Sequence, residues 1–510
     1  MKLPLITLFF LLLAPHAMAQ HLYWIQYNHK STPLHEVTQY FDRQAIVNRA
    51  QANIPWDQRD LPIDAEHKLW AASQGKVLLH SRWFNASVVA TKQDLTQCSF
   101  PDGVVEIKKM QSVLIDQYPA VQNSVLVSDT FAIKLARQQT EIFGFKHSAN
   151  SRGKGVRIAV LDAGFNGLLT HPAFKHLIEN NQLVAIRDFI RKKDGKHSGG
   201  SHGTAVLSCI AGMYKDIPLG LATDAEFLLA RTEYNHREPL KEEVLWLAAA
   251  EWADSLGANI INSSLGYTYH RYLPHQMNGE ESLVAKAAQI ASEKGMLVVN
   301  AMGNDGSSPW HYLGTPADAS DVLSVGGVDP FSYKHIGFSS YGPTGKGVLK
   351  PNVSAPGFAW CAKPNGSYEG MYGTSFATPL ITGLAACIWQ KHPDKSNQAI
   401  KTILEKSGHL YPFYNYAVGY GIPYFEDQRD EVTVSCVRET DSLFVQISKL
   451  PEERTHDTQL HIALCGNNQQ LIYYASYSLS KPMLKISIPN LPNASKIMLS
   501  YYGTYEELDY

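Results

Sequence analysis

Cysteine and charge are both scarce in this chain. Six cysteines in 510 residues are too few for a scaffold held together by disulfides. Only 18% of the residues are charged, and 45 Lys and Arg against 47 Asp and Glu give a net charge of −2. This balance provides no electrostatic attraction to nucleic acid, and we expect no nucleic-acid partner. The hydrophobic residues, 45% of the chain, can fill the cores of roughly two to four domains.

No apolar run after residue 19 is long enough to span a bilayer. Before that residue, Lys2 precedes the apolar run 3–14, and the small residues Ala17 and Ala19 precede Gln20. This pattern predicts a secretory signal peptide over residues 1–19. The alternative is a membrane anchor, but spanning a bilayer takes about 20 apolar residues and the run is shorter. We therefore expect an exported protein, secreted or periplasmic, with no membrane-spanning segment.

Residues 20–120 have the pattern of a small α/β domain. Helix-compatible stretches alternate with four strand-like runs, at 22–27, 76–80, 83–90 and 104–108. One helix is expected between the first and second strands, and another between the third and fourth. The order β-α-β-β-α-β predicts a ferredoxin-like module.

Residues 121–427 alternate between buried strands and helices. The strands are expected at 156–161, 225–230, 258–263 and 296–300. A helix is expected over about 240–256, with Glu242, Glu243 and Glu251 among its solvated positions. A second helix, over about 282–294, is expected to stop at Gly295. This alternation predicts an α/β domain with a mostly parallel sheet covered by helices on both faces.

Residues 428–510 alternate between apolar and polar with a period of two. The alternation covers 432–434, 443–447, 459–464 and 484–488, with prolines between the runs, and predicts a small all-β sandwich. Its cysteines, Cys436 and Cys465, could pair in an oxidising compartment. Cys209 and Cys387 lie in apolar helical runs instead, where they are predicted to be buried as small hydrophobic side chains.

Polar segments follow the strands of the predicted parallel sheet. Asp162 ends the first strand, Ser264-Leu265-Gly266 follows the third, and Gly303-Asn304 follows the fourth. Ligands of such sheets bind beyond the carboxyl ends of the strands. The fold therefore predicts that these segments lie along one edge of the sheet.

Two more polar residues begin apolar helices. His202 precedes the run 205–211, and Ser375 follows Gly373 ahead of a longer apolar run. Taken singly, Ser375 could be an ordinary helix cap and His202 an ordinary histidine. His197, in the preceding Gly/Ser-rich loop, is the nearest rival as a base.

Acyl transfer by a serine needs a base, a carboxylate that orients the base, and hydrogen-bond donors for the oxyanion. Together with Ser375 as the nucleophile, His202, Asp162 and Asn304 can fill these three roles, in that order.

Three motifs resemble the catalytic motifs of subtilisin-like serine proteases, the subtilase or peptidase S8 family. They are Asp162-Ala163-Gly164, His202-Gly203-Thr204 and Gly373-Thr374-Ser375-Phe376-Ala377-Thr378-Pro379, in the family's order of acid, base and nucleophile. The resemblance covers about 150–425. It implies the three-layer subtilisin-like fold, a serine endopeptidase that cuts proteins or peptides, and no required cofactor.

The resemblance also implies roles for single residues. Asp162, His202 and Ser375 would form the catalytic triad, and the Asn304 side chain with the Ser375 N–H would form the oxyanion hole. Ser264, Leu265, Gly266 and Gly303 would bind the substrate. Two positions depart from the commonest pattern, because Tyr267 stands where many relatives have glycine and Met302 where alanine or serine is usual.

For residues 20–120 the resemblance implies an inhibitory propeptide that assists folding, with cleavage expected after about Leu114; a permanent accessory domain is the alternative. Calcium sites are common in the family, and no residue of this chain is assigned to one. The rival function is a catalytically silent subtilisin fold that serves as a binding or surface protein. The residue preferred before the cut bond cannot be read from these motifs.

Overall fold

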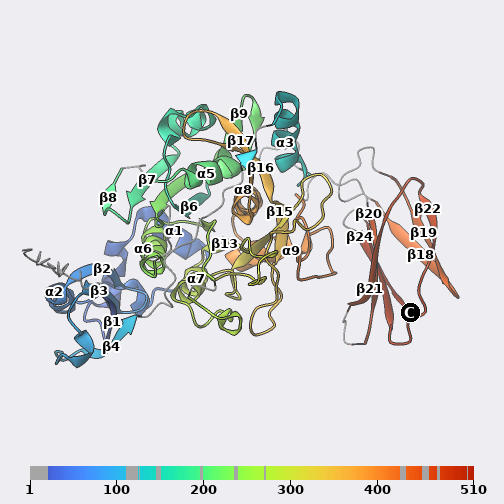
Figure 1. The fold of residues 1–510 in the computed structure, drawn as a ribbon. Coiled ribbons are helices and arrows are strands. Elements are labelled where there is room, and N and C mark those ends of the chain that lie inside the picture. Colours follow the sequence, from blue (N-terminus) through green and yellow to red (C-terminus); the bar gives the residue numbers. More distant parts are fainter. Residues whose placement is uncertain are drawn as a thin grey trace, which may run out of the picture. The chain divides into compact units, whose positions relative to one another are not determined.

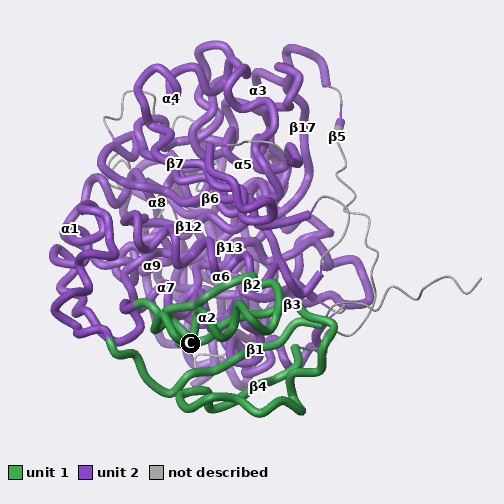
Figure 2. The backbone as a smooth tube through the Cα atoms, turned by 90° about the vertical axis from the view of Figure 1, so that its left-hand side faces the viewer, with its two compact units in different colours: residues 1–31, 62–111 green, residues 32–61, 112–510 purple. Residues whose placement is uncertain are grey.

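The computed structural model describes residues 21–110, 124–125, 127–144, 151–195, 199–234, 239–268, 271–425, 432–450, 459–467, 471–501 and 504–510. The predicted signal peptide, His197 and the predicted cleavage region after Leu114 lie outside these residues. The chain forms two compact units (Figure 2). The smaller unit takes in residues up to Ser31 and Pro62–Gln111, and the larger takes in Thr32–Leu61 and the chain from Ser112 onward.

The smaller unit is a four-stranded sheet with one helix. Its elements are β1 (His21–Tyr27), α2 (Ala65–Gln74), β2 (Lys76–Ser81), β3 (Ala86–Thr91) and β4 (Val104–Met110). The strand order is β2-β3-β1-β4 and every pairing is antiparallel, as in a ferredoxin-like module. The second predicted helix is wrong, because between β3 and β4 only the short 3-10 turn Leu95–Gln97 forms. Pro101 and Gly103, the latter at φ 93°, end any helical path there.

Residues 32–61 belong to the larger unit, although the sequence places them between β1 and α2. They contain the 3-10 turn Leu34–Tyr40, helix α1 (Arg43–Gln51) and the 3-10 turn Gln58–Asp60. Asp42 caps α1, since its side chain accepts from the Gln44 N–H. We call residues 32–61 the arm.

The centre of the larger unit is an eight-stranded sheet in the order β15-β14-β13-β12-β6-β11-β7-β8 (Figure 1). Its strands are β6 (Arg157–Asp162), β7 (Leu183–Asp188), β8 (Lys193–Asp194), β11 (Glu226–Arg231), β12 (Ile260–Ser263), β13 (Leu297–Ala301), β14 (Leu323–Val328) and β15 (Val353–Pro356). All neighbours are parallel except β7 and β8. The predicted mostly parallel sheet is confirmed. Strands β7, β8, β14 and β15 were not predicted. The side chains of β7 are mostly half-exposed, and β14 and β15 are buried but have serine or glycine residues among their apolar ones.

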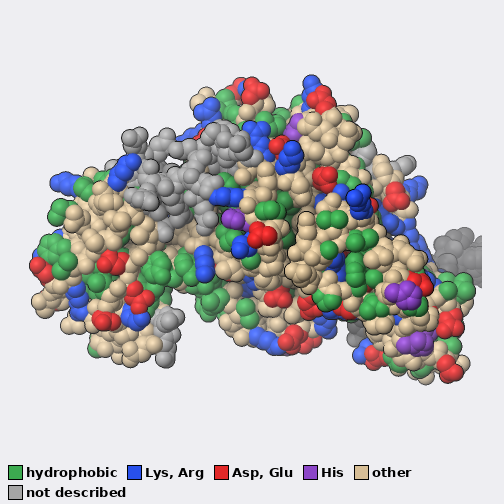
Figure 3. Space-filling model, turned by 180° about the vertical axis from the view of Figure 1, so that it is seen from behind, with side chains coloured by type: hydrophobic (Ala, Val, Ile, Leu, Met, Phe, Trp, Pro, Cys, Tyr) green, Lys and Arg blue, Asp and Glu red, His purple; other side chains and the backbone are tan. Residues whose placement is uncertain are grey.

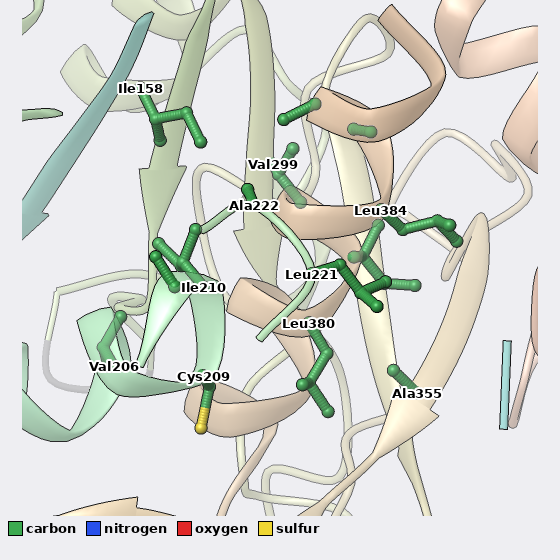
Figure 4. Close-up of a cluster of buried hydrophobic side chains, with 14 of the residues drawn as sticks. Ile158, Val206, Cys209, Ile210, Leu221, Ala222, Val299, Ala355, Leu380 and Leu384 are labelled. Carbon is green, nitrogen blue, oxygen red and sulfur yellow. The ribbon is translucent and has the colours of Figure 1, made fainter. Parts of the chain in front are cut away.

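Helices cover both faces of this sheet. On one face lie α5 (His202–Ala211) and α8 (Thr374–Lys391), whose apolar side chains meet those of the strands (Figure 4). Val206 and Ile210 of α5 and Leu380 and Leu384 of α8 all belong to this core. On the other face lie α6 (Lys241–Ser255) and α7 (Leu283–Glu293). The two β12 neighbours Asn262 and Ser263 mark these faces, because Asn262 binds Thr382 of α8 and Ser263 binds Trp246 of α6.

Smaller elements complete the larger unit. They are β5 (Ser124–Val125), α3 (Asp129–Glu141), α4 (Lys175–Glu179), β9 (Met213–Tyr214), β10 (Ile217–Pro218), β16 (Phe358–Ala362), β17 (Tyr368–Tyr372) and α9 (Asn397–Lys406). Strands β16, β17 and β5 form a small antiparallel sheet, and β17 leads directly into α8. The predicted stop of α7 is confirmed, since Gly295 follows the helix at φ 93°.

The predicted solvation of the α6 glutamates is wrong. Glu242, Glu243 and Glu251 are all buried. Glu243 accepts hydrogen bonds from Arg271, at 2.7 Å, and from the Tyr272 hydroxyl. A carboxylate can be buried when a cation and hydrogen-bond donors compensate its charge. Here the cation, Arg271, lies 28 positions further along the chain, where a local sequence pattern does not reveal it.

The C-terminal residues form two facing sheets. One contains β18 (Val434–Glu439), β19 (Ser442–Ile447) and β22 (Met483–Ser487), and the other β20 (Gln459–Cys465), β21 (Leu471–Ser478), β23 (Lys496–Tyr501) and β24 (Thr504–Asp509). Apolar side chains from both sheets share one core, so the predicted sandwich is confirmed. Cys436 and Cys465 lie in different sheets as free thiols, contrary to the suggested pairing. Cys209 and Cys387 are buried free thiols, as predicted.

Charged side chains of both signs are interspersed on the face of the molecule drawn in Figure 3, in keeping with the nearly balanced composition. Within the described part of the chain, none of the helices is both long enough and apolar enough to cross a bilayer.

Candidate active site

Asp162 and His202 form the first half of the site. Asp162 is the last residue of β6 and is almost fully buried, and His202 is the first residue of α5. The His202 Nδ1 atom lies 2.8 Å and 3.1 Å from the two carboxylate oxygens. The helix can start this close to the strand because residue 203 is glycine: a Cβ there would lie 2.7 Å from the Gly164 carbonyl oxygen and 3.0 Å from Asp162 Cβ.

The electrostatics of this pair favour a protonated imidazole. Burial lowers the pKa of His202, but the negative charge of Asp162 and its hydrogen bond outweigh that effect, so the pKa lies above the ordinary value of 6.5. The Asp162 carboxylate also accepts a hydrogen bond from the Ala163 N–H at 2.7 Å. The same oxygen, Oδ1, therefore accepts from the Ala163 N–H and makes the shorter of the two contacts with His202 Nδ1.

Ser375 is held at the start of α8. Gly373, at φ 151°, precedes the helix, and Ser375 lies in its first turn, where backbone N–H groups have no acceptor within the helix. The Ser375 hydroxyl donates to the Ser264 carbonyl at 3.2 Å, and the Ser264 hydroxyl donates to the Ser375 carbonyl at 2.9 Å. The neighbouring Phe376 ring lies beside His202, with ring centroids 5.7 Å apart. Ser375 thus belongs to the same cluster as the Asp162–His202 pair, with its hydroxyl directed to Ser264 in this structure.

Asn304 lies at the same end of α8. Its side-chain oxygen accepts from the backbone N–H of Thr374 at 2.9 Å and from the Thr374 hydroxyl at 3.0 Å. A Cβ placed on Gly373 would lie 3.6 Å from the Asn304 amide nitrogen. Because Thr374 takes the oxygen, the amide NH2 group lies on the side of Gly373, where it can act as a donor. The sequence analysis assigned no role to Thr374, and its only signal was its place within the serine motif.

The segment after β12 runs beside the serine. Ser264, Leu265 and Gly266 follow the strand, and the Asn300 side chain donates to the Leu265 carbonyl at 3.0 Å. A Cβ on Gly266 would meet nothing closer than 3.7 Å, so another backbone has room to approach. Gly303, at φ 108°, turns the chain between β13 and Asn304. All four residues suggested for substrate binding therefore follow carboxyl ends of strands in the same sheet.

The two departures from the common family pattern lie inside the protein. Tyr267 is buried rather than on the surface, and the Arg271 guanidinium lies 4.1 Å from its ring centroid. The backbone of Tyr267 pairs with Thr315 in both directions. Met302 is fully buried with Leu313 and Ala317, behind the turn at Gly303.

Among the residues that the structure describes, no group of three or more His, Cys, Asp or Glu side chains could hold a metal ion. We therefore assign no calcium ligand.

The pKa of His202 makes activity depend on pH. A base must be neutral to accept a proton, so kcat/KM for a short peptide should fall as the pH drops through the His202 pKa, with the midpoint above 6.5. Removing the negative charge, as in Asp162→Asn, should lower the His202 pKa itself. A pH profile of the unsubstituted enzyme and an NMR titration of His202 in both proteins measure this, and a His202 pKa unaffected by the substitution would contradict the assignment.

Four side chains lie at one edge of a parallel sheet. A buried carboxylate contacts a histidine at the start of one helix, and a serine and an asparagine lie at the start of another. This combination of fold and site defines the subtilisin-like serine peptidases. A model of the subtilase family, Peptidase S8, matches residues 153–421, which is more than half of the chain, and the chain belongs to this family. A model of the Peptidase S8 propeptide domain of Bacteroidota matches residues 22–124.

Curated proteins agree with the family assignment. Subtilisin BL of Lederbergia lenta is 30% identical over 263 residues, 51% of this chain and 86% of that protein. Subtilisin E of Bacillus subtilis (strain 168) is 28% identical over 337 residues, 65% of this chain and 78% of that protein. M-protease of Shouchella clausii (strain KSM-K16) is 29% identical over 262 residues, which are 51% of this chain and 61% of that protein. Among solved structures, the S41 psychrophilic protease matches with a TM-score of 0.47 and 24% identity, over 56% of this chain and 97% of that one. The protein is thus a serine endopeptidase with an N-terminal propeptide domain.

Proposed function

We propose that the protein is an exported serine endopeptidase, made as an autoinhibited zymogen, that uses Asp162, His202 and Ser375 as its triad and Asn304 in its oxyanion hole. The proposal rests mainly on the hydrogen bond between the buried Asp162 carboxylate and His202 Nδ1, which are 2.8 Å apart. This contact fixes the imidazole tautomer in which Nε2 is free to accept a proton.

Acylation begins when the Ser375 hydroxyl turns from the Ser264 carbonyl toward His202. Hydrogen bonds of this kind are often incomplete before substrate binds. The Ser375 oxygen attacks the scissile carbonyl carbon, and its proton passes to His202 Nε2. The resulting oxyanion accepts hydrogen bonds from the Asn304 amide and the Ser375 N–H at the positive end of α8. His202 then gives its proton to the leaving amine as the C–N bond breaks.

Deacylation repeats the same steps with water. His202 takes a proton from the water as the water oxygen attacks the acyl carbon. The second oxyanion accepts hydrogen bonds from the same donors as the first. When the ester bond breaks, the proton returns from His202 to the Ser375 oxygen. Asp162 stays ionised throughout and stabilises the imidazolium.

The substrate of this proposal is an extended peptide. Its backbone would pair with Ser264, Leu265 and Gly266 on one side and with Gly303 on the other, which leaves the scissile carbonyl beside Ser375. The open space at Gly266 and the adjacency of Ser264 to Ser375 support this placement. Export is supported by the signal-peptide pattern of residues 1–19.

A serine-directed phosphonate probe tests the function. It forms a covalent bond with an activated serine, so we expect it to label Ser375 in processed enzyme and nothing in heat-denatured enzyme. Peptide mass spectrometry locates the label. Labelling of another residue, or none in folded processed protein, would favour the rival function, a catalytically silent fold used for binding.

A further inference from the structure

The arm, residues 32–61, contains a buried network of charges shared with the rest of the larger unit. Arg49 Nη2 lies 3.0 Å from Asp60 and 2.9 Å from Asp254 at the end of α6. Lys294, just past α7, lies 2.8 Å from the same Asp60. The side chains of these four residues are only 0–4% exposed. Two cations and two buried anions are therefore in contact, and Lys294 also pairs with the partly exposed Asp57 at 3.0 Å. Each of the four buried partners left alone would be a buried charge.

The arm also binds the backbone at the ends of these helices. The Asp42 N–H donates to the Ser255 carbonyl and the Asn48 side chain to the Gly257 carbonyl, both at 2.8 Å. These carbonyls end α6, where the helix itself has no donors for them. A Cβ on Gly257 would lie 2.5 Å from the backbone nitrogen of Ala45, so only glycine lets α1 pack this closely.

A small core of its own stabilises the arm. Val37, Phe41, Ala45 and Leu61 are buried together, and Ile46 and Trp56 pack against them. The Arg49 guanidinium lies 4.8 Å from the Trp56 ring centroid. The packing of these apolar side chains therefore keeps Arg49 in place within the charge network.

The arm is bound at the end of the sheet opposite to the candidate active site. Helices α6 and α7 end just before β12 and β13 begin, so the arm contacts the edge where these strands start. Ser264 and Asn304 follow the other ends of the same two strands. The arm therefore leaves the edge that contains Ser375 uncovered.

We propose that the arm is a retention site, which keeps the N-terminal segment bound to the peptidase domain after the chain is cut between residues 110 and 124. The cut itself rests on the proposed function. The four-stranded unit is joined covalently to both ends of the arm, at Ser31 and Pro62. Cleavage therefore does not free that unit to diffuse away, because a tethered domain keeps a high local concentration around the peptidase domain. The mature enzyme is a complex of two chains.

The test separates retention from catalysis. A recognition sequence for a site-specific protease is inserted between residues 110 and 124 of the full chain carrying Ser375→Ala, so that cleavage needs no activity of the protein itself. After the cut, gel filtration should show both fragments in one peak, also after dilution and in 1 M NaCl, because buried ion pairs are screened only weakly. Separation of the two fragments under these conditions would overturn the proposal.

Matched arginine variants in the same chain test the contacts. Arg49→Ala removes the cation that Asp60 and Asp254 share and leaves Asp60 with Lys294, so it should make the cut N-terminal fragment dissociate at least about 100-fold more readily. Arg59→Ala is the control. Arg59 pairs with Glu293 at 2.5 Å and with Asp57 at 2.8 Å, but all three side chains are about 40% exposed, and loss of such pairs should change dissociation by less than about fivefold.

A melting curve of each uncut variant shows whether it folds. If Arg49→Ala does not fold, Asp254→Asn removes one anion of the network from the other side of the contact and takes its place. Equal dissociation of the Arg49 and Arg59 variants, or none in either, would contradict a role for the buried network.

Discussion

Ser375→Ala should lower kcat for peptide hydrolysis by about 10⁶-fold, the loss measured for the nucleophile of subtilisin itself. Without the hydroxyl no acyl-enzyme can form, and only the oxyanion donors and substrate positioning remain. These retain a residual acceleration of about 10³–10⁴ over water. Progress curves with a short chromogenic peptide, at enzyme concentrations high enough to detect the residual rate, measure the effect.

The same variant tests self-processing. If the chain cuts its own N-terminal segment, purified Ser375→Ala should stay at full length while the unsubstituted protein shortens, as N-terminal sequencing would show. Ser396→Ala is a matched control: Ser396 caps α9 by accepting from the Ala399 N–H and lies outside the site, so its loss should cost about 1 kcal/mol of stability and leave kcat unchanged. Processing of pure Ser375→Ala at the normal rate would rule out self-cleavage.

Asp162→Asn should lower kcat by about 10⁴-fold with little change in KM. The Ala163 N–H donates to Oδ1, so an asparagine would keep its oxygen at that position and place its NH2 group at the Oδ2 position, 3.1 Å from His202 Nδ1. Nδ1 would then have to accept, the proton would move to Nε2, and His202 could no longer take the proton of Ser375. The acid–base geometry would survive with the wrong tautomer.

Steady-state kinetics of Asp162→Asn and of Asp224→Asn measure this effect. Asp224 is an exposed carboxylate of the same domain, and its substitution should leave kcat within about twofold because exposed charges contribute little. If Asp162→Asn raised KM and left kcat unchanged, Asp162 would contribute to substrate binding and would have no effect on His202 as the base.

Strand ends could be predicted from the sequence because buried strands in an α/β domain are continuous apolar runs. That is why Asp162 and Asn304 could be expected at one edge of the sheet, and why the fold class was predictable. Hydrophobic periodicity gave the wrong burial for Glu243. A charged residue is expected to be solvated unless a partner for it is known, and the partner of Glu243, Arg271, is remote in sequence. The same limit hid the arm, since Arg49 and Asp254 are separated by 205 positions.

Details of the site were hidden for a related reason. Thr374 orients Asn304, and Ser264 binds Ser375 in both directions, through contacts between segments far apart in the chain. No local pattern contains such information. Tyr267 illustrates the converse, because an aromatic residue in a polar loop segment was equally compatible with exposure, and only the position of Arg271 over its ring explains its burial.

The shared charges of the arm also limit which parts can be exchanged between related proteins. Asp254 and Lys294 belong to the peptidase domain, whereas Arg49 and Asp60 belong to the arm. An N-terminal segment taken from a relative without this arm would remove the charges of Arg49 and Asp60 that pair with Asp254 and Lys294. Substitutions at these four positions are therefore expected to be tolerated only in combination, and the peptidase domain and its own N-terminal segment constrain each other's sequence.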